Sequence, residues 1–205
     1  MYKNFGKRVL DFLMAFMALI ILSPFFIVIM IGLFIANSGK PFFFQLRPGK
    51  GERIFKIIKF RTMNDKTDKN GDLLPDAKRL TPIGTMVRKT SMDEIPQLIN
   101  VLMGDMSLIG PRPLLLRYLP YYTDKERLRH TVRPGITGLA QVNGRNTVRW
   151  DARLALDVEY VENLNFKQDM LIFYKTFLKV VGAKNIVVDP ESIMKNLDDE
   201  RKLQD

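Results

Sequence analysis

The most strongly patterned part of the chain is residues 9–36, which are almost entirely apolar. Asp11 is the only charged residue in this run, which is longer than the roughly 20 residues that a helix needs to cross a membrane. Ser23 and Pro24 lie near its middle, and a proline inside a helix removes one backbone hydrogen bond and kinks the helix. The pattern therefore predicts a long apolar helix that is broken at Ser23-Pro24.

Basic residues flank the apolar run on both sides, so the positive-inside tendency places both of its ends in the cytoplasm. They are Lys3, Lys7 and Arg8 before the run and Lys40, Arg47, Lys50 and Arg53 after it. Each half of a broken helix would have about 14 residues and measure about 20 Å, which is too short to span the hydrocarbon core. We therefore expect a re-entrant helix-break-helix; a straight spanning helix and a cleaved signal peptide are the alternatives.

Shorter elements follow the apolar run. Residues 41–45 and 53–60 have strand patterns around a turn at 47–51, which predicts a β-hairpin. Residues 64–82 are polar and are expected to form a loop, and the glycine-rich residues 133–145 are not expected to be helical. Helices or helical turns are predicted at residues 83–89, 95–103, 114–122, 125–130 and 150–163.

Residues 167–182 give the clearest amphipathic helix, because apolar side chains recur at helical spacing along one face. These side chains are Met170, Phe173, Tyr174, Phe177, Leu178 and Val181. Such a face can lie in the lipid headgroup layer or pack on a protein core, and the pattern leaves both open. The expected fold class is α+β and mostly helical. It comprises a re-entrant membrane helix (1–38), a cytoplasmic catalytic domain with a short β-hairpin and amphipathic interfacial helices (39–188), and an acidic tail (189–205).

Charge indicates an anionic partner. The net charge is +10, and residues 189–205 hold six acidic and three basic residues, so the rest of the chain carries +13. Nucleic acid, anionic lipid and a nucleotide-type substrate all fit such a surface. The chain has no cysteine, which excludes disulfides and thiolate metal sites, and its only histidine, His130, lies among arginines that disfavour a bound cation.

Candidate chemistry centres on the adjacent carboxylates of Asp93 and Glu94, at the predicted start of a helix. One carboxylate can attack phosphorus while the other holds a divalent cation. The structural alternative is helix capping, since residues 91–94 fit a capping box and Asp93 could itself be the N-cap. The two interpretations are compatible, because a carboxylate at a helix start stays ionised.

Arginines near this acidic pair suit the recognition of phosphate oxygens. Arg112 lies between two prolines that restrict its backbone, and a rigidly placed guanidinium suits bidentate phosphate binding. Arg88 precedes Asp93 by five residues, and Arg145 closes the glycine-rich segment. Glycines at positions 135, 138 and 144 would permit tight turns whose backbone amides face an anion.

The order of these segments is more specific than any one of them. Residues 59–63, 93–97, 104–107, 110–113 and 133–146 follow the broken apolar helix in sequence. Over residues 2–182 this arrangement resembles the bacterial sugar transferases, the monotopic phosphoglycosyl transferases. The length of the chain is similar to that of the small members that begin glycan assembly, in particular those of protein N-glycosylation.

The resemblance implies an activity: ping-pong transfer of a phospho-sugar from a UDP-sugar to polyprenyl (undecaprenyl) phosphate, with release of UMP. It implies that Asp93 forms a phospho-aspartyl intermediate and that Glu94, with Asp93, binds Mg²⁺. The phosphate-binding residues it implies are Lys59, Arg88, Arg112 and Arg145. The expected location is the cytoplasmic face of the bacterial inner membrane, with membrane lipid but no nucleic acid as a partner.

Two other functions account for part of the sequence. A membrane-tethered adaptor that binds anionic lipid or nucleic acid would explain the charge and the apolar helix, but it gives the acidic pair no role. A magnesium-dependent phosphatase would share the phospho-aspartate step without needing a lipid acceptor. The sequence does not select the sugar.

Overall fold

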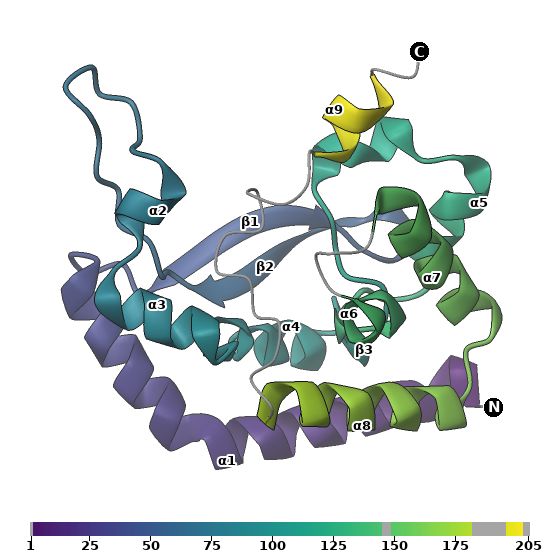
Figure 1. The fold of residues 1–205 in the computed structure, drawn as a ribbon. Helices are drawn as coiled ribbons and strands as arrows, with labels where there is room; N and C mark the ends of the chain where they lie inside the picture. The colour runs from purple at the N-terminus through teal and green to yellow at the C-terminus, as the bar shows by residue number, and fades with distance from the viewer. Residues whose placement is uncertain (1, 145–148, 182–195, 203–205) are drawn as a thin grey trace.

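The computed structural model describes residues 2–144, 149–181 and 196–202. Its described part is mostly helical, as expected from the sequence pattern, and contains two small two-stranded sheets (Figure 1). One described helix, α1 (Lys7–Ala36), is long and apolar enough to cross a membrane. A short π-helical turn, Tyr2–Gly6, precedes it.

Helix α1 is continuous but bent, with one arm on each side of the bend (Figure 1). Pro24 lies inside the helix and has no backbone N–H to donate to the carbonyl of Ile20, four residues earlier. The hydroxyl of Ser23 donates to that carbonyl instead, at 2.7 Å. The serine therefore satisfies the backbone group that the proline leaves without a partner.

Both arms of α1 pack on the same body. In the first arm, Ala15 is buried beside Val101 of α4 (Gln97–Met103). In the second arm, Leu33 is buried beside Val87 of α3 (Pro82–Lys89) and Phe60 of β2 (Ile54–Phe60). The predicted hairpin is present, with β2 antiparallel to β1 (Phe42–Pro48) and a 3-10 turn, Lys50–Glu52, between them.

A second sheet was not anticipated. Strand β3 (Ser107–Ile109) pairs in parallel with β4 (Gly135–Thr137), and α6 (Leu139–Asn143) follows. The expectation that residues 133–145 contain no helix is therefore wrong for α6. A Cβ on Gly135 would lie 2.1 Å from the backbone nitrogen of Gly110, so this glycine permits close backbone approach rather than a turn around an anion.

The other helices and helical turns precede or follow these elements along the chain. They are α2 (Asp76–Arg79), a 3-10 turn (Leu116–Tyr121), α5 (Asp124–Arg127), a 3-10 turn (Leu128–Thr131), α7 (Trp150–Glu162), α8 (Phe166–Val181) and α9 (Leu197–Arg201). Within the acidic tail, Leu197 of α9 is fully buried against Tyr118 and Trp150. The described part of the tail therefore packs on the body.

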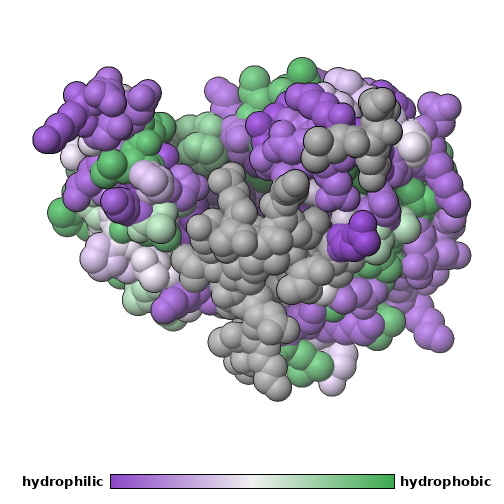
Figure 2. Space-filling view, turned by 45° about the horizontal axis from the view of Figure 1, so that its top comes forward, coloured by the Kyte–Doolittle hydropathy of each residue, from purple (hydrophilic) through white to green (hydrophobic). Residues whose placement is uncertain are grey.

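Helix α8 turns most of its predicted apolar stripe outward. Its exposed large side chains are Phe166, Leu171, Phe173, Tyr174, Phe177 and Leu178, while Ile172 is buried. The beginnings of α8 and α1 are joined, because Lys7 forms a 2.6 Å ion pair with Asp169. Figure 2, in which the top of Figure 1 comes forward, shows a mostly hydrophilic surface on that upper side. The exposed side chains of α1, by contrast, are apolar.

Candidate functional site

Asp93 and Glu94 lie in a 3-10 turn, Met92–Glu94, between α3 and α4. Ser91 precedes the turn in the left-handed conformation (φ 57°) and makes no capping hydrogen bond, so the expected capping box is not formed. Asp93 is not an N-cap either, because Pro96 occupies that position in α4. The structural alternative of helix capping is therefore wrong for this acidic pair.

Glu94 instead joins two cations from distant parts of the chain. Its Oε1 accepts from Lys59 Nζ at 2.8 Å and from Arg112 Nη2 at 2.5 Å, and its Oε2 accepts from Arg112 Nη1 at 3.4 Å. Lys59 lies near the end of β2, and Arg112 follows β3. The structure therefore brings these predicted phosphate-binding residues to the acidic pair.

The backbone of Arg112 is fixed on both sides of the residue. Gly110 N donates to Thr137 O at 2.8 Å, and Gly135 N donates to Pro111 O at 3.0 Å, which extends the pairing of β3 with β4. The carbonyl of Arg112 itself accepts from Arg129 Nη2 at 2.7 Å. The orientation of this arginine is therefore set by the second sheet as well as by its flanking prolines.

Arg129 belongs to a buried polar cluster that the sequence did not reveal. Both Arg129 and Asp157 are almost fully buried, and two guanidinium nitrogens donate to Asp157 Oδ2 at 3.1 and 2.8 Å. Arg129 also donates to the hydroxyl of Tyr122 at 3.1 Å. No periodic pattern in the sequence marks these residues.

Arg88 approaches the acidic pair from α3. Its Nε donates to Thr62 Oγ1 at 2.8 Å, which orients the side chain toward the end of β2. Its positive charge acts on Asp93, as do those of Lys59 and Arg112. Three of the four predicted phosphate-binding residues thus converge here, and the fourth, Arg145, lies outside the described residues.

The pKa values of the two carboxylates are shifted in opposite directions. Burial, helped by the adjacent Glu94, raises the pKa of Asp93 to about 6 against the effect of the three cations. Burial also acts to raise the pKa of Glu94, but Arg112 and Lys59 outweigh it and hold that pKa below its usual range. In the described part of the chain, no hydrogen bond or ion pair reaches the Asp93 carboxylate. Asp93 is therefore the free, more basic member of the pair.

A divalent cation would find few protein ligands at this site. The described residues contain no group of three or more side chains from His, Cys, Asp and Glu that could hold a metal. Mg²⁺ is commonly bound by one or two carboxylates together with substrate phosphates. The pair Asp93 and Glu94 fits that mode, in which the substrate supplies the other oxygen ligands.

Known proteins resemble the chain along most of its length. The sequence model of the family described as bacterial sugar transferase matches residues 2–183. An uncharacterized sugar transferase of Bacillus subtilis, EpsL, is 49% identical over 181 residues, covering 88% of this chain and 89% of that protein. The UDP-glucose:undecaprenyl-phosphate glucose-1-phosphate transferase of Caulobacter vibrioides is 35% identical over 191 residues, or 87% and 71% of the two chains. The undecaprenyl-phosphate galactose phosphotransferase of Salmonella typhimurium is 38% identical over 192 residues, or 84% and 40%.

Proposed function

Because the chain belongs to the bacterial sugar transferase family and is a sugar phosphotransferase, we propose that it moves a sugar-1-phosphate from a UDP-sugar to undecaprenyl phosphate. The observation that carries this proposal is the Asp93–Glu94 turn. It pairs a free carboxylate of raised pKa with one that two cations neutralise. That arrangement suits nucleophilic attack on an anionic phosphorus centre.

In the first step, a carboxylate oxygen of Asp93 attacks the phosphorus that carries the sugar. A bond from Asp93 to phosphorus forms, the bond from phosphorus to the bridging oxygen breaks, and UMP leaves with that oxygen and its electron pair. Arg112 has five N–H donors, and two of them donate to Glu94. Its side chain is 43% exposed. It can therefore bind a non-bridging phosphate oxygen while it remains oriented by Glu94.

In the second step, a phosphate oxygen of undecaprenyl phosphate attacks the same phosphorus. The bond from phosphorus to Asp93 breaks and the carboxylate of Asp93 is regenerated. The product is the undecaprenyl diphosphate that carries the sugar. Lys59 and Arg88 stabilise the negative charge that builds up on the phosphoryl oxygens in both steps. Because attack and release use the same carboxylate, the donor half of the reaction proceeds without the acceptor.

Mg²⁺ belongs to this proposal as a partner of the donor's diphosphate. Glu94 and Asp93 would hold it together with phosphate oxygens, and the ion would neutralise charge on the leaving UMP. Glu94→Gln removes one carboxylate charge while preserving the size of the side chain. We expect this variant to require more Mg²⁺ for half-maximal rate; an unchanged Mg²⁺ titration would assign the metal to other ligands.

We also propose that the chain is monotopic and lies on the cytoplasmic face of the inner membrane, with α1 re-entering on one side. The bend at Pro24, the positive flanks and the packing of both α1 arms on one body support this topology. A cysteine placed near the amino terminus should resist an impermeant thiol reagent in intact cells. Labelling of that cysteine would instead indicate a spanning helix.

Release of UMP tests the reaction itself. Full-length enzyme with a UDP-sugar should release UMP continuously only when undecaprenyl phosphate is present, and the sugar phosphate should appear on the lipid. A phosphatase of similar chemistry would transfer to water and need no lipid. Continuous release of UMP with water as the only acceptor would therefore contradict the transferase.

The sugar has to be identified by experiment, because the relatives are named for galactose, glucose and N-acetylgalactosamine. A hydroxyl or methyl difference in an apolar pocket changes binding by only about 1–3 kcal/mol. A panel of UDP-sugars, including hexoses and N-acetylated amino sugars, measured by kcat/KM would select the donor. It would also test the expected link to protein glycosylation.

A further inference from the structure

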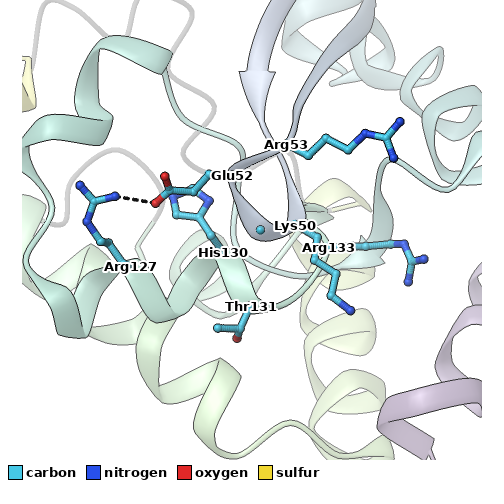
Figure 3. Close-up of a pocket in the computed structure, with 8 residues that line it drawn as sticks. Lys50, Glu52, Arg53, Arg127, His130, Thr131 and Arg133 are labelled. Atoms are coloured by element: carbon cyan, nitrogen blue, oxygen red, sulfur yellow. Dashed lines mark hydrogen bonds and ion pairs between the residues drawn. The ribbon is translucent and has the colours of Figure 1, made fainter.

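A cavity of about 680 Å³ lies at the turn of the hairpin (Figure 3), and neither Asp93 nor Glu94 is among its lining residues. Its lining residues are Lys50, Gly51, Glu52, Arg53, Arg127, His130, Thr131 and Arg133. Arg53 is six residues from Lys59 along β2, or about 20 Å at the usual rise of a strand. None of the residues placed in the transfer chemistry lines this cavity.

The cavity is strongly cationic. Its one carboxylate, Glu52, is already engaged by Arg127 Nη1 at 2.6 Å. Lys50 and Arg53 are exposed, and neither side chain has a hydrogen bond or ion pair with the described residues. Figure 3 shows the side chains of Lys50, Arg53 and Arg133 together on one side of the cavity. The uncompensated charge of this side favours an anionic ligand.

A buried polar atom at the cavity wall also lacks a partner. His130 is 6% exposed, and its Nε2 has no hydrogen-bond partner within the described residues. Burial and the nearby Arg129 lower the pKa of His130 to about 4, so the ring is neutral near pH 7. A buried nitrogen without a partner is uncommon and is typically satisfied by a ligand or a water.

The cationic side of the cavity leads to the start of the apolar helix. Arg133 Nε donates to the carbonyl of Gly104, at the end of α4, at 2.8 Å. Arg8, in the first turn of α1, donates to the carbonyls of Val101 and Leu102 at the same end of α4. Figure 3 shows α1 beyond Lys50 and Arg133. The cavity therefore lies near the start of α1, where basic residues are followed by exposed apolar side chains.

We propose that this cavity binds the phosphate headgroup of an anionic membrane phospholipid. Two exposed apolar side chains, Met103 (58%) next to Gly104 and Leu128 (38%) next to Arg127 in the sequence, are suited to the adjoining acyl region. Its lining includes no Phe, Tyr or Trp on which a nucleotide base would stack. The proposal rests on the membrane location proposed above, and it assigns a regulatory or anchoring lipid to a site distinct from the lipid acceptor's chemistry.

The test uses the full-length protein in nanodiscs of phosphatidylcholine that contain a minor fraction of phosphatidylglycerol. Native mass spectrometry then counts the phosphatidylglycerol molecules that stay bound. Lys50→Ala/Arg53→Ala should reduce retention more than tenfold, because each cation near an anionic lipid contributes roughly fivefold. The control Lys78→Ala/Lys125→Ala removes the same charge from exposed positions outside the cavity and should retain the lipid.

Equal loss of lipid in the two double variants would mean that the general positive field, and not the cavity, holds it. Unchanged retention in Lys50→Ala/Arg53→Ala would also overturn the proposal. Displacement of the lipid by equimolar UMP or inorganic phosphate would assign the cavity to a soluble phosphate. Asp93→Asn should retain the lipid, because Asp93 does not line the cavity. The assay contains no donor sugar, so a failure of the proposed transfer mechanism would leave the lipid-binding result unaffected.

Discussion

Asp93 and Asp157 are two carboxylates that lie close to arginines, yet they differ in how their oxygens are used. Asp157 is 2% exposed, and Arg129 donates two hydrogen bonds to its Oδ2. Asp93 is half-buried in a field of three cations, but no described residue bonds to its carboxylate. The oxygens of Asp157 are bonded within the fold, whereas the carboxylate of Asp93 is left free beside cations and is available to react with phosphorus.

Arg112 connects the two regions. Its side chain pairs with Glu94 at the reactive turn, and its carbonyl accepts from Arg129 of the buried pair. The fully bonded region therefore supplies the rigidity with which the reactive region holds its phosphate-binding group. Substitutions that change only one of the two regions should separate loss of chemistry from loss of stability.

The largest effect is expected for Asp93→Asn. Removing the nucleophile of a covalent mechanism should lower kcat by about 10⁴-fold or more. Stability should not fall, since a folded pKa raised to about 6 means that ionisation of Asp93 costs stability once the pH exceeds the unfolded value. The measurements are UMP release and the thermal midpoint at pH 7. Substantial remaining turnover would show that Asp93 is not the nucleophile.

Asp157→Asn makes the same chemical change in the other region and should have the opposite result. It leaves the buried guanidinium of Arg129 without its countercharge, which typically costs about 3–5 kcal/mol. Denaturant unfolding of the solubilised protein measures this loss. Asp151→Asn, at a carboxylate with 71% exposure, is the matched control and should change stability little. If the two variants are equally stable, the buried pair contributes no net stabilisation.

Arg112→Lys tests the contact that joins the regions. The substitution keeps the positive charge but removes the planar fork that binds phosphate through two N–H groups. We expect kcat/KM for the UDP-sugar to fall by about 10–100-fold, the equivalent of one charge-assisted contact. Arg117→Lys changes an exposed arginine five residues away and should have no effect. A near-normal kcat/KM in Arg112→Lys would show that Arg112 contributes only its positive charge.

The pH dependence should show the smallest change. Asp93 must be ionised to attack, so the rate of phospho-enzyme formation should fall about tenfold per pH unit below its pKa of about 6. The donor half-reaction has to be measured alone, because the phosphate of the lipid acceptor titrates in the same range. An acid limb with a midpoint near 4 would indicate an unperturbed carboxylate and contradict the environment described for Asp93.

The parts of the fold that were predicted correctly have local signals. Alternation predicted the hairpin, helical spacing predicted α8, and Ser23-Pro24 predicted the bend in α1. The parallel pairing of β3 with β4 was not predicted, because strands of three residues are too short to carry an alternating pattern. Helix α6 was not predicted, because it is short and lies within the glycine-rich residues 133–145.

The candidate site shows the same limit. Its carboxylates and three of its cations were identified from spacing and family resemblance. The pairing of Lys59 and Arg112 with Glu94 was not predicted, because these cations lie 35 and 18 residues away and the local sequence also allowed a capping box. In the sequence, Arg129 is only one of the arginines near His130, and nothing local indicates that it is buried and bonded to Asp157. Long-range pairing of charges is decided by the packed fold.

The most direct test of the central claim is to trap the intermediate. The enzyme is mixed with its UDP-sugar and Mg²⁺ in the absence of undecaprenyl phosphate, quenched, digested and analysed by mass spectrometry. The peptide containing Asp93 should carry the added mass of one sugar phosphate, in an amount equal to the UMP released. Release of that UMP without the added mass, or with the mass on another residue, would contradict the assignment of Asp93 as the nucleophile.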